Sequence, residues 1–187
     1  MAKGQWVGVN GVARKVKNKY VGVGGVARKI KAGWVGIGGV ARQYFGGISY
    51  KFVEYKGSSS YIKSVDVSAG ISGSNWAFSV TATLSRTIDG GQPQACVQIE
   101  NTDLAGKTLS MSYQTQAYTQ YTGAFIYCFD SAGASTGYWD ISDKTSKTVT
   151  IPANTVMIQI GVEVHKDGTN TRTLTVSSLT IGDEKLV

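Results

Sequence analysis

The chain has 187 residues, of which 42% are hydrophobic and 17% charged, a composition that supports a buried core and argues against wholesale disorder. No run approaches 18 uninterrupted apolar residues, which excludes a membrane-spanning helix, and one His with two Cys argues against a zinc site of the usual kind. The motifs of P-loop enzymes, serine hydrolases and zinc proteases do not occur, so the composition points away from an enzyme.

Charge divides the chain into two parts. Residues 1–51 carry seven Lys and three Arg and no acidic residue, a net charge of +10, whereas residues 52–187 have a net charge of −3. Residues 1–10 lack the apolar stretch of a secretory signal, so we expect synthesis in the cytoplasm. The simplest interpretation is a basic module over residues 1–47 and a second module over residues 48–187.

The basic module is a repeat with a period of 14 residues. Each copy places Asn-Gly or Gly-Gly between two short β-prone runs, which predicts a hairpin with a two-residue turn. In the first copy such a turn sets Val9 opposite Val12 and Trp6 opposite Lys15. A lone hairpin is only marginally stable, so we expect the hairpins to stack on one another or to associate with other copies of the chain. The three copies read WVGVNGVARKVKNK, YVGVGGVARKIKAG and WVGIGGVARQYFGG.

Aromatic and arginine side chains recur at fixed positions of the repeat, and we predict that they serve attachment or oligomerisation. Ten uncompensated positive charges would attract phosphate, but no recognition helix or base-stacking motif accompanies them, so nucleic-acid binding is the less favoured interpretation. Docking on an acidic partner surface is a further possibility. The predicted attachment residues are Trp6, Tyr20, Trp34, Arg14, Arg28 and Arg42.

From about residue 48 the pattern changes to longer strands with period-two alternation, clearest over 76–84 and 156–164. Residues 124–129 are apolar on both faces, as in a central strand. Turn-rich segments, among them 130–137 and 166–170, separate the strands, and no segment has a helical period. About nine strands predict an all-β fold, an antiparallel sandwich resembling a jelly roll that follows the hairpin repeats. The other predicted strands are 49–55, 61–68, 95–100, 107–113, 147–151 and 172–181.

Two segments resemble known families. The pattern aromatic-Val-Gly-Val-x-Gly-Val-Ala-Arg-Lys within 6–47 resembles short repeats of phage-related minor structural proteins of Gram-positive bacteria. The run TVTIPANT (148–155), followed by LTVSSLTI (174–181), is similar to the last strands of carbohydrate-binding-module-like sandwiches of phage tail proteins. The resemblance implies a virion component, made in the bacterial host cytoplasm, with a surface-exposed β-domain that contacts host glycans.

Aromatic residues outside the apolar alternation are the candidate sugar contacts, because sugar-binding sandwiches stack rings on pyranoses and bond the hydroxyls with polar side chains. Trp76 heads the apolar face of its strand and is predicted to lie in the core. His165 is predicted to be a surface residue without a role. The predicted carbohydrate-binding residues are Tyr118, Tyr121, Tyr138, Trp139 and Asp140.

The acidic residues do not form a recognisable catalytic arrangement. A glycosidase needs two carboxylates roughly 5–10 Å apart, whereas these are scattered in turn-like places, so turn and cap chemistry is favoured. No cofactor or metal site is predicted; calcium is compatible with a sandwich, but no ligand string marks it. The residues considered are Glu100, Asp103, Asp130, Asp140 and Asp143.

The two cysteines leave an alternative open. Cys96 and Cys128 could pair if neighbouring strands bring their Cα atoms within about 7 Å. Cytoplasmic synthesis favours two free thiols, with Cys128 as a small buried hydrophobe.

The leading hypothesis is a non-enzymatic phage structural protein. The hairpins would attach it to the particle or to sister subunits, with a trimer preferred by analogy with tail fibres, and the sandwich would bind host-surface carbohydrate with avidity from many copies. Three alternatives stay open: a capsid-decoration or other purely architectural virion protein without a ligand, a small depolymerase, and nucleic-acid contact by residues 1–51.

Overall fold

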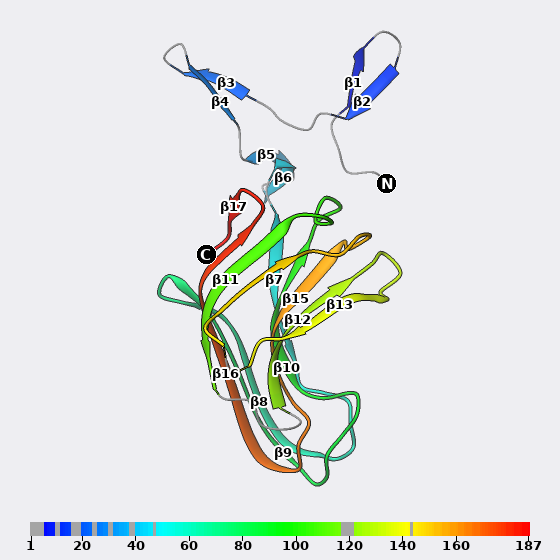
Figure 1. Ribbon diagram of the computed structural model, residues 1–187, viewed down its shortest axis with the longest axis vertical. Helices are drawn as coiled ribbons and strands as arrows, with labels where there is room; N and C mark the ends of the chain where they lie inside the picture. Colours follow the sequence, from blue (N-terminus) through cyan, green and yellow to red (C-terminus); the bar gives the residue numbers. More distant parts are fainter. Residues whose placement is uncertain are drawn as a thin grey trace. The chain divides into compact units, whose positions relative to one another are not determined.

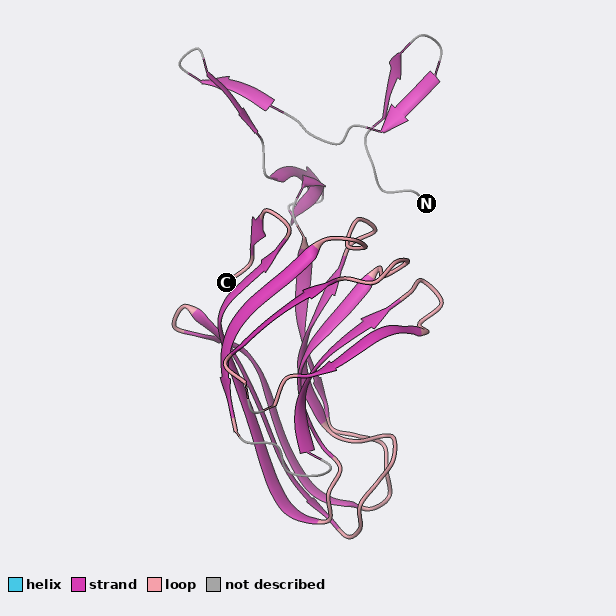
Figure 2. Cartoon of the chain, in the orientation of Figure 1, coloured by secondary structure: helices cyan, strands magenta, loops and turns pink. Residues whose placement is uncertain are grey.

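The structure is a computed structural model that describes residues 48–116, 122–142 and 144–187, together with six strands between residues 6 and 46 (Figure 1). The described residues form strands, turns and loops without a helix (Figure 2), which confirms the all-β prediction. The chain divides into two compact units, Met1–Gly47 and Ile48–Val187.

The first unit contains one antiparallel hairpin per repeat, and each hairpin is a two-stranded sheet of its own. The register of the first hairpin is the predicted one, with Trp6 opposite Lys15 and Val9 opposite Val12, because a two-residue turn fixes the pairing. The stacking of the hairpins and the attachment role of Trp6, Arg14, Tyr20, Arg28, Trp34 and Arg42 stay predictions. The strands are β1 (Trp6–Val9), β2 (Val12–Lys15), β3 (Tyr20–Val23), β4 (Val26–Lys29), β5 (Ala32–Ile37) and β6 (Val40–Gly46).

The second unit is a sandwich of two antiparallel sheets (Figure 1). The five-stranded sheet has the order β13 (Ser135–Asp140), β12 (Thr122–Phe129), β15 (Met157–Val164), β10 (Gln94–Glu100) and β7 (Ser49–Tyr55). The six-stranded sheet has the order β14 (Ser146–Thr150), β11 (Thr108–Thr115), β16 (Gly168–Ile181), β9 (Asn75–Leu84) and β8 (Ile62–Ser72), and β17 (Glu184–Lys185) pairs with β16.

The eight strands from β9 to β16 connect the two sheets in jelly-roll order. They place β14, β11, β16 and β9 side by side in one sheet and β13, β12, β15 and β10 in the other, and β8 and β7 extend the edges. Each sheet therefore interleaves strands that are distant in sequence, which confirms the predicted jelly-roll-like sandwich.

The structure differs from the prediction at three strands. β13 begins at Ser135, inside the predicted break at 130–137, because its backbone pairs with β12 although its residues are typical of a loop. β16 begins at Gly168, inside the predicted break at 166–170, because its first residues continue the ladder with β9. The short strand β17 has no periodic signal and was not predicted.

The core lies between the two sheets and follows the predicted alternation. On β9, side chains of alternate residues from Trp76 to Leu84 are at most 3% exposed, and those from Ile158 to Val164 on β15 are fully buried. Trp76 lies in the core as predicted. Because strand side chains alternate between faces, the remaining residues of each strand form the two outer faces of the sandwich.

Candidate functional site

The outer face of the five-stranded sheet carries a row of side chains that crosses all five strands. We call this surface the five-stranded face. Strand pairing places these residues opposite one another, one from each strand, so they lie side by side although they are far apart in sequence. From β13 to β7 the row reads Tyr138, Tyr127, Gln159, Gln98 and Lys51.

Aromatic rings occupy the β12 and β13 end of this face. The ring centroids of Tyr127 and Tyr138 are 4.6 Å apart, and Tyr127 also lies 5.0 Å from Phe125 and 5.9 Å from Phe129 along its own strand. Tyr138 keeps 50% of its surface exposed. A supported, half-exposed ring of this kind offers an apolar surface that is already held in place for a ligand.

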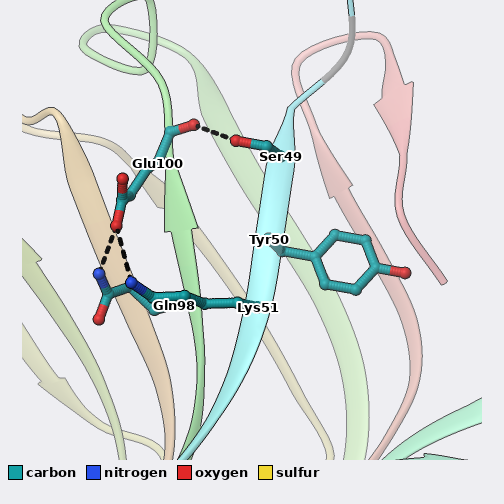
Figure 3. A pocket seen from close by; sticks show the side chains of 5 residues that line it. All are labelled: Ser49, Tyr50, Lys51, Gln98 and Glu100. Atoms are coloured by element: carbon teal, nitrogen blue, oxygen red, sulfur yellow. Dashed lines mark hydrogen bonds and ion pairs between the residues drawn. The ribbon is translucent and has the colours of Figure 1, made fainter. Parts of the chain in front are cut away.

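Polar side chains occupy the middle and the β7 end of the face. Gln159 Nε2 donates a hydrogen bond to Gln98 Oε1 (3.3 Å), Gln98 Nε2 donates to Glu100 Oε1, and Lys51 Nζ lies 3.4 Å from the same carboxylate oxygen. With Ser49, three of these residues line a shallow pocket of about 120 Å³ (Figure 3). These amides and charged groups can replace the hydrogen bonds that they form with one another by hydrogen bonds to a polar ligand.

Tyr50 borders the same pocket but does not contribute its ring to it. Figure 3 shows the ring pointing to the other side of β7 from Lys51. It lies 4.7 Å from the ring of Trp76 and 5.9 Å from that of Phe52. The ring of Tyr50 thus contacts the aromatic rings on the inner side of β7, while 40% of the residue stays exposed.

A buried carboxylate lies on β15, the middle strand of the five-stranded face, near the end of that strand. Glu163 is 4% exposed, and its Oε2 accepts hydrogen bonds from Gln92 Nε2 (3.1 Å) and Gln94 Nε2 (2.9 Å), while its Oε1 lies 3.3 Å from His165 Nε2. Burial and, secondarily, the Glu163 charge raise the pKa of the Cys96 thiol to about 12, and the same two causes raise the pKa of Tyr127.

The outer face of the six-stranded sheet is chemically different. Threonine and serine hydroxyls dominate it and bond to one another across strands, as in the pairs Thr81–Thr171 (3.0 Å) and Thr83–Thr169 (2.9 Å). These residues have high β-propensity and suit a solvated sheet face. Their strands carry Ser64, Ser68, Ser79, Thr81, Thr83, Ser110, Ser112, Ser146, Thr148, Thr169, Thr171, Thr173 and Thr175 at these positions.

The predicted sugar-binding residues have three different outcomes. Tyr138 and Asp140 share the five-stranded face, and Asp140 Oδ1 also accepts a hydrogen bond from Ser142 N (2.8 Å). The predicted pairing of Tyr138 with Trp139 is wrong, because adjacent strand residues point to opposite faces, and Trp139 packs against the core. Tyr118 and Tyr121 lie outside the described residues.

Several residues of this face were missed at the sequence level. Tyr127 lies in the run that is apolar on both sides, which was interpreted as a buried central strand. Gln98 and Gln159 are brought together only by strand pairing. Glu163 did have a signal: it is a single carboxylate in a strand whose other residues are all uncharged.

The acidic residues singled out in the sequence act mainly in turns and ion pairs. Asp130 Oδ1 accepts hydrogen bonds from the backbone N–H groups of Ala132 and Ala134, both at 2.9 Å, and Asp103 pairs with Lys107 at 3.6 Å. Asp143 lies outside the described residues. Within residues 48–116, 122–142 and 144–187, no group of three His, Cys, Asp or Glu residues could hold a metal ion.

The remaining sequence predictions concern His165 and the cysteines. His165 is half-buried beside Glu163, so the predicted surface position is wrong, and the absence of a role stays a prediction. Cys96 and Cys128 are free and buried, the alternative that the sequence analysis favoured. Cys96 lies on the five-stranded face and Cys128 in the core. In the part of the chain that the structure describes, no helix has the length and hydropathy needed to cross a membrane.

Comparisons with known proteins found similarity to several solved structures. No protein-family model matches the sequence, and no curated protein matches it. The chain is similar to the enzymatically active domain of tailspike protein 4 of bacteriophage CBA120, with 14% identity and a TM-score of 0.42 over 71% of this chain and 19% of that chain. It is similar to CBM4, with 14% identity and a TM-score of 0.42 over 71% of this chain and 85% of that one. It is also similar to a family 29 carbohydrate-binding module complexed with cellulohexaose, with 10% identity and a TM-score of 0.37 over 71% of this chain and 89% of that one.

Proposed function

We propose that the sandwich binds carbohydrate through the five-stranded face. The observation that carries the proposal is the half-exposed ring of Tyr138, supported by Tyr127 and followed along one row by Gln159, Gln98 and Lys51. A sugar ring presents an apolar C–H face and a rim of hydroxyls. An aromatic ring can stack on the apolar C–H face, and amide groups, which both donate and accept hydrogen bonds, can bond the hydroxyls.

The contrast between the two outer faces supports this choice of surface. A sheet face that only needs to be solvated can be built from threonine and serine, as the outer face of the six-stranded sheet is. The five-stranded face instead holds exposed and half-buried rings, amides and a buried carboxylate. Exposed aromatic groups beside polar side chains are the composition of a binding surface.

We further propose that the chain is a non-enzymatic structural component of a phage particle. The repeat pattern of residues 6–47 supports this role, with the basic hairpins attaching the chain to other virion proteins or to sister subunits. Single sugar sites bind weakly, but many tethered copies, for example in a trimer, gain roughly 10²–10⁴ in avidity for host-surface glycans.

The test is binding of the full chain to a panel of bacterial cell-wall polysaccharides, measured by glycan array and calorimetry, with the Tyr138→Ala variant beside it. A tyrosine side chain offers about 200 Å², so a sugar that covers one side of the half-exposed ring removes about 50 Å² from water, equivalent to about 1.2 kcal/mol. Tyr138→Ala should therefore weaken binding about eightfold.

Tyr61→Ala is the matched control. Tyr61 is 40% exposed and its ring lies against Arg86, away from the five strands, so its removal should leave the affinity unchanged. Equal affinities of the Tyr138→Ala and Tyr61→Ala variants would place the site elsewhere. Absence of any binding by a chain that still joins the particle would favour the purely architectural alternative.

A further inference from the structure

The charges on the five-stranded face are mainly negative. Its five strands contribute the carboxylates of Glu163, Glu100 and Asp140, against the single ammonium group of Lys51, which is already paired with Glu100. His165 adds a positive charge only when it is protonated. The three carboxylates therefore outnumber the cationic groups of this surface whatever the charge of His165.

Glu163 is the charge that matters most, because it is buried. Its partners are the amides of Gln92 and Gln94 and the ring of His165, and none of the described Lys or Arg residues forms an ion pair with it. Hydrogen bonds hold the carboxylate in place without cancelling its charge. Salt screens a buried charge much less than an exposed one, so its potential persists at physiological ionic strength.

The influence of Glu163 reaches the centre of the face. Its charge contributes to the raised pKa of both Cys96 and Tyr127, which lie on neighbouring strands on either side of β15. Tyr127 supports the exposed ring of Tyr138. Glu163 and Tyr127 thus lie on the same outer face of neighbouring strands, and a ligand group over the aromatic rings shares that face with the carboxylate.

The side-chain amides beside Glu163 direct their N–H groups to the carboxylate, which leaves an amide oxygen as a further negative group. Because the Nε2 groups of Gln92 and Gln94 donate to the carboxylate, the orientation of both amides is fixed. Gln92 Oε1 is then a buried acceptor without a hydrogen-bond partner among the described residues. Its partial negative charge adds to that of the carboxylate, although the atom is too buried for a surface ligand to reach.

We propose that the five-stranded face selects uncharged or amino-bearing glycans and rejects glycans that carry carboxylate or phosphate groups. This inference rests on the proposed carbohydrate-binding function and names its ligand class. The physical basis is repulsion: an anionic substituent brought over the rings would lose hydration and meet a buried like charge. An uncharged hydroxyl group at the same place avoids this repulsion, and an ammonium group is attracted by the negative charge.

The experiment measures binding of the full chain to three oligosaccharide probes of equal length. These are chitin oligosaccharides (uncharged), chitosan oligosaccharides (amino-bearing) and oligogalacturonates (acidic), printed beside the wall polysaccharides. Wild-type protein should prefer the first two classes at 0.15 M salt. Glu163→Gln removes the charge at nearly constant size and should reduce the preference over acidic probes about tenfold.

Two further variants keep the test decisive if Glu163→Gln fails to fold. Glu100→Gln changes a carboxylate that is 55% exposed, so it should fold and reduce the same preference by about twofold, because solvent screens that charge. Asp66→Asn makes the same charge change on β8, on the outer face of the six-stranded sheet, and should leave the preference unchanged.

The outcomes separate this inference from the proposed function. Binding of no probe or polysaccharide overturns the carbohydrate-binding proposal and this inference with it. Tightest binding to acidic glycans overturns the inference alone. The inference alone is also overturned if Glu163→Gln and Glu100→Gln, like Asp66→Asn, do not change the ratio of the affinity for uncharged probes to that for acidic probes.

Discussion

Gly161 provides a sharp test of the sandwich, because the structure leaves no room for even one methyl group there. The residue lies on β15, directly opposite Cys96 of β10 and Phe125 of β12. A Cβ atom at this position would collide with the carbonyl oxygen of Ala95 and lie 2.5 Å from Cys96 Cβ and 2.7 Å from Cys96 Cα. Backbone atoms cannot move aside as a flexible side chain does, so Gly161→Ala must push β15 and β10 apart.

Gly161→Ala should therefore destabilise the sandwich by about 1–3 kcal/mol, the cost of one extra methyl group in a well-packed region. Urea unfolding followed by tryptophan fluorescence measures this, and with a denaturant slope of about 2 kcal/mol per M the midpoint should fall by about 1 M. The slope itself should stay constant, because the surface exposed on unfolding does not change.

Gly70→Ala is the matched control, since it makes the same change on another strand. No atom lies within 4 Å of a Cβ placed at Gly70 of β8, and the residue does not have a positive φ. This variant should be neutral or gain up to about 1 kcal/mol, because alanine restricts the unfolded chain more than glycine does. Equal unfolding midpoints for the two variants would refute the close approach of β15 and β10.

Three further predictions concern buried groups. Burial raises the pKa of the Cys96 thiol from 9.0 to about 12 and that of Cys128 to about 11, so both thiols stay protonated in the folded chain while the unfolded chain ionises. These two groups should therefore leave the free energy of unfolding constant below pH 9 and lower it between pH 9 and 12. The decrease should be smaller in the Cys96→Ala variant. A free energy of unfolding, measured in urea, that does not change between pH 9 and 12 would contradict this. Tyr113 is 2% exposed and its hydroxyl has no hydrogen-bond partner among the described residues, so Tyr113→Phe should be neutral or stabilising by up to about 1 kcal/mol, whereas a large loss would reveal a hidden partner. Trp139 packs against the core, so Trp139→Ala should lower the melting temperature and reduce the free energy of unfolding by about 2 kcal/mol, as for a half-buried ring. The glycan affinity of the folded variant should stay within about twofold of wild type. An unchanged melting temperature with lost binding would instead support the original prediction that Trp139 contacts sugar.

The sequence predicted the fold well, because the signals for it are local. Period-two alternation marks a strand with one buried face, and it correctly placed Trp76 and the residues after it in the core. The hairpin register follows from two turn residues, since a tight turn allows only one pairing. Jelly-roll order could be anticipated from the number and spacing of strands, whereas the partners of each strand could not.

The candidate site was harder to predict, because it consists of residues that only strand pairing brings together. Gln98 and Gln159 are 61 residues apart in the chain and become neighbours through the β10–β15 ladder. Tyr127 was hidden for a different reason: a strand with a ring-bearing outer face has the same apolar pattern as a central strand buried on both faces. Tyr138 follows the predicted break at 130–137, in a stretch where no strand was predicted, so alternation was not applied to it and it was paired with Trp139.

The distribution of unfavourable features over the two outer faces of the sandwich is itself an argument for where its function lies. The outer face of the six-stranded sheet consists largely of hydroxyl residues that bond to their neighbours, and it needs no compensation from the rest of the fold. The five-stranded face has a buried carboxylate without a cationic Lys or Arg partner among the described residues, a buried amide oxygen without a hydrogen bond, and an exposed ring. Each of these costs stability, and hydrophobic or hydroxyl side chains at the same positions would not. Sequences that are otherwise consistent with their fold concentrate such exceptions at functional sites, so the same features that weaken this sheet support the assignment of ligand binding to it.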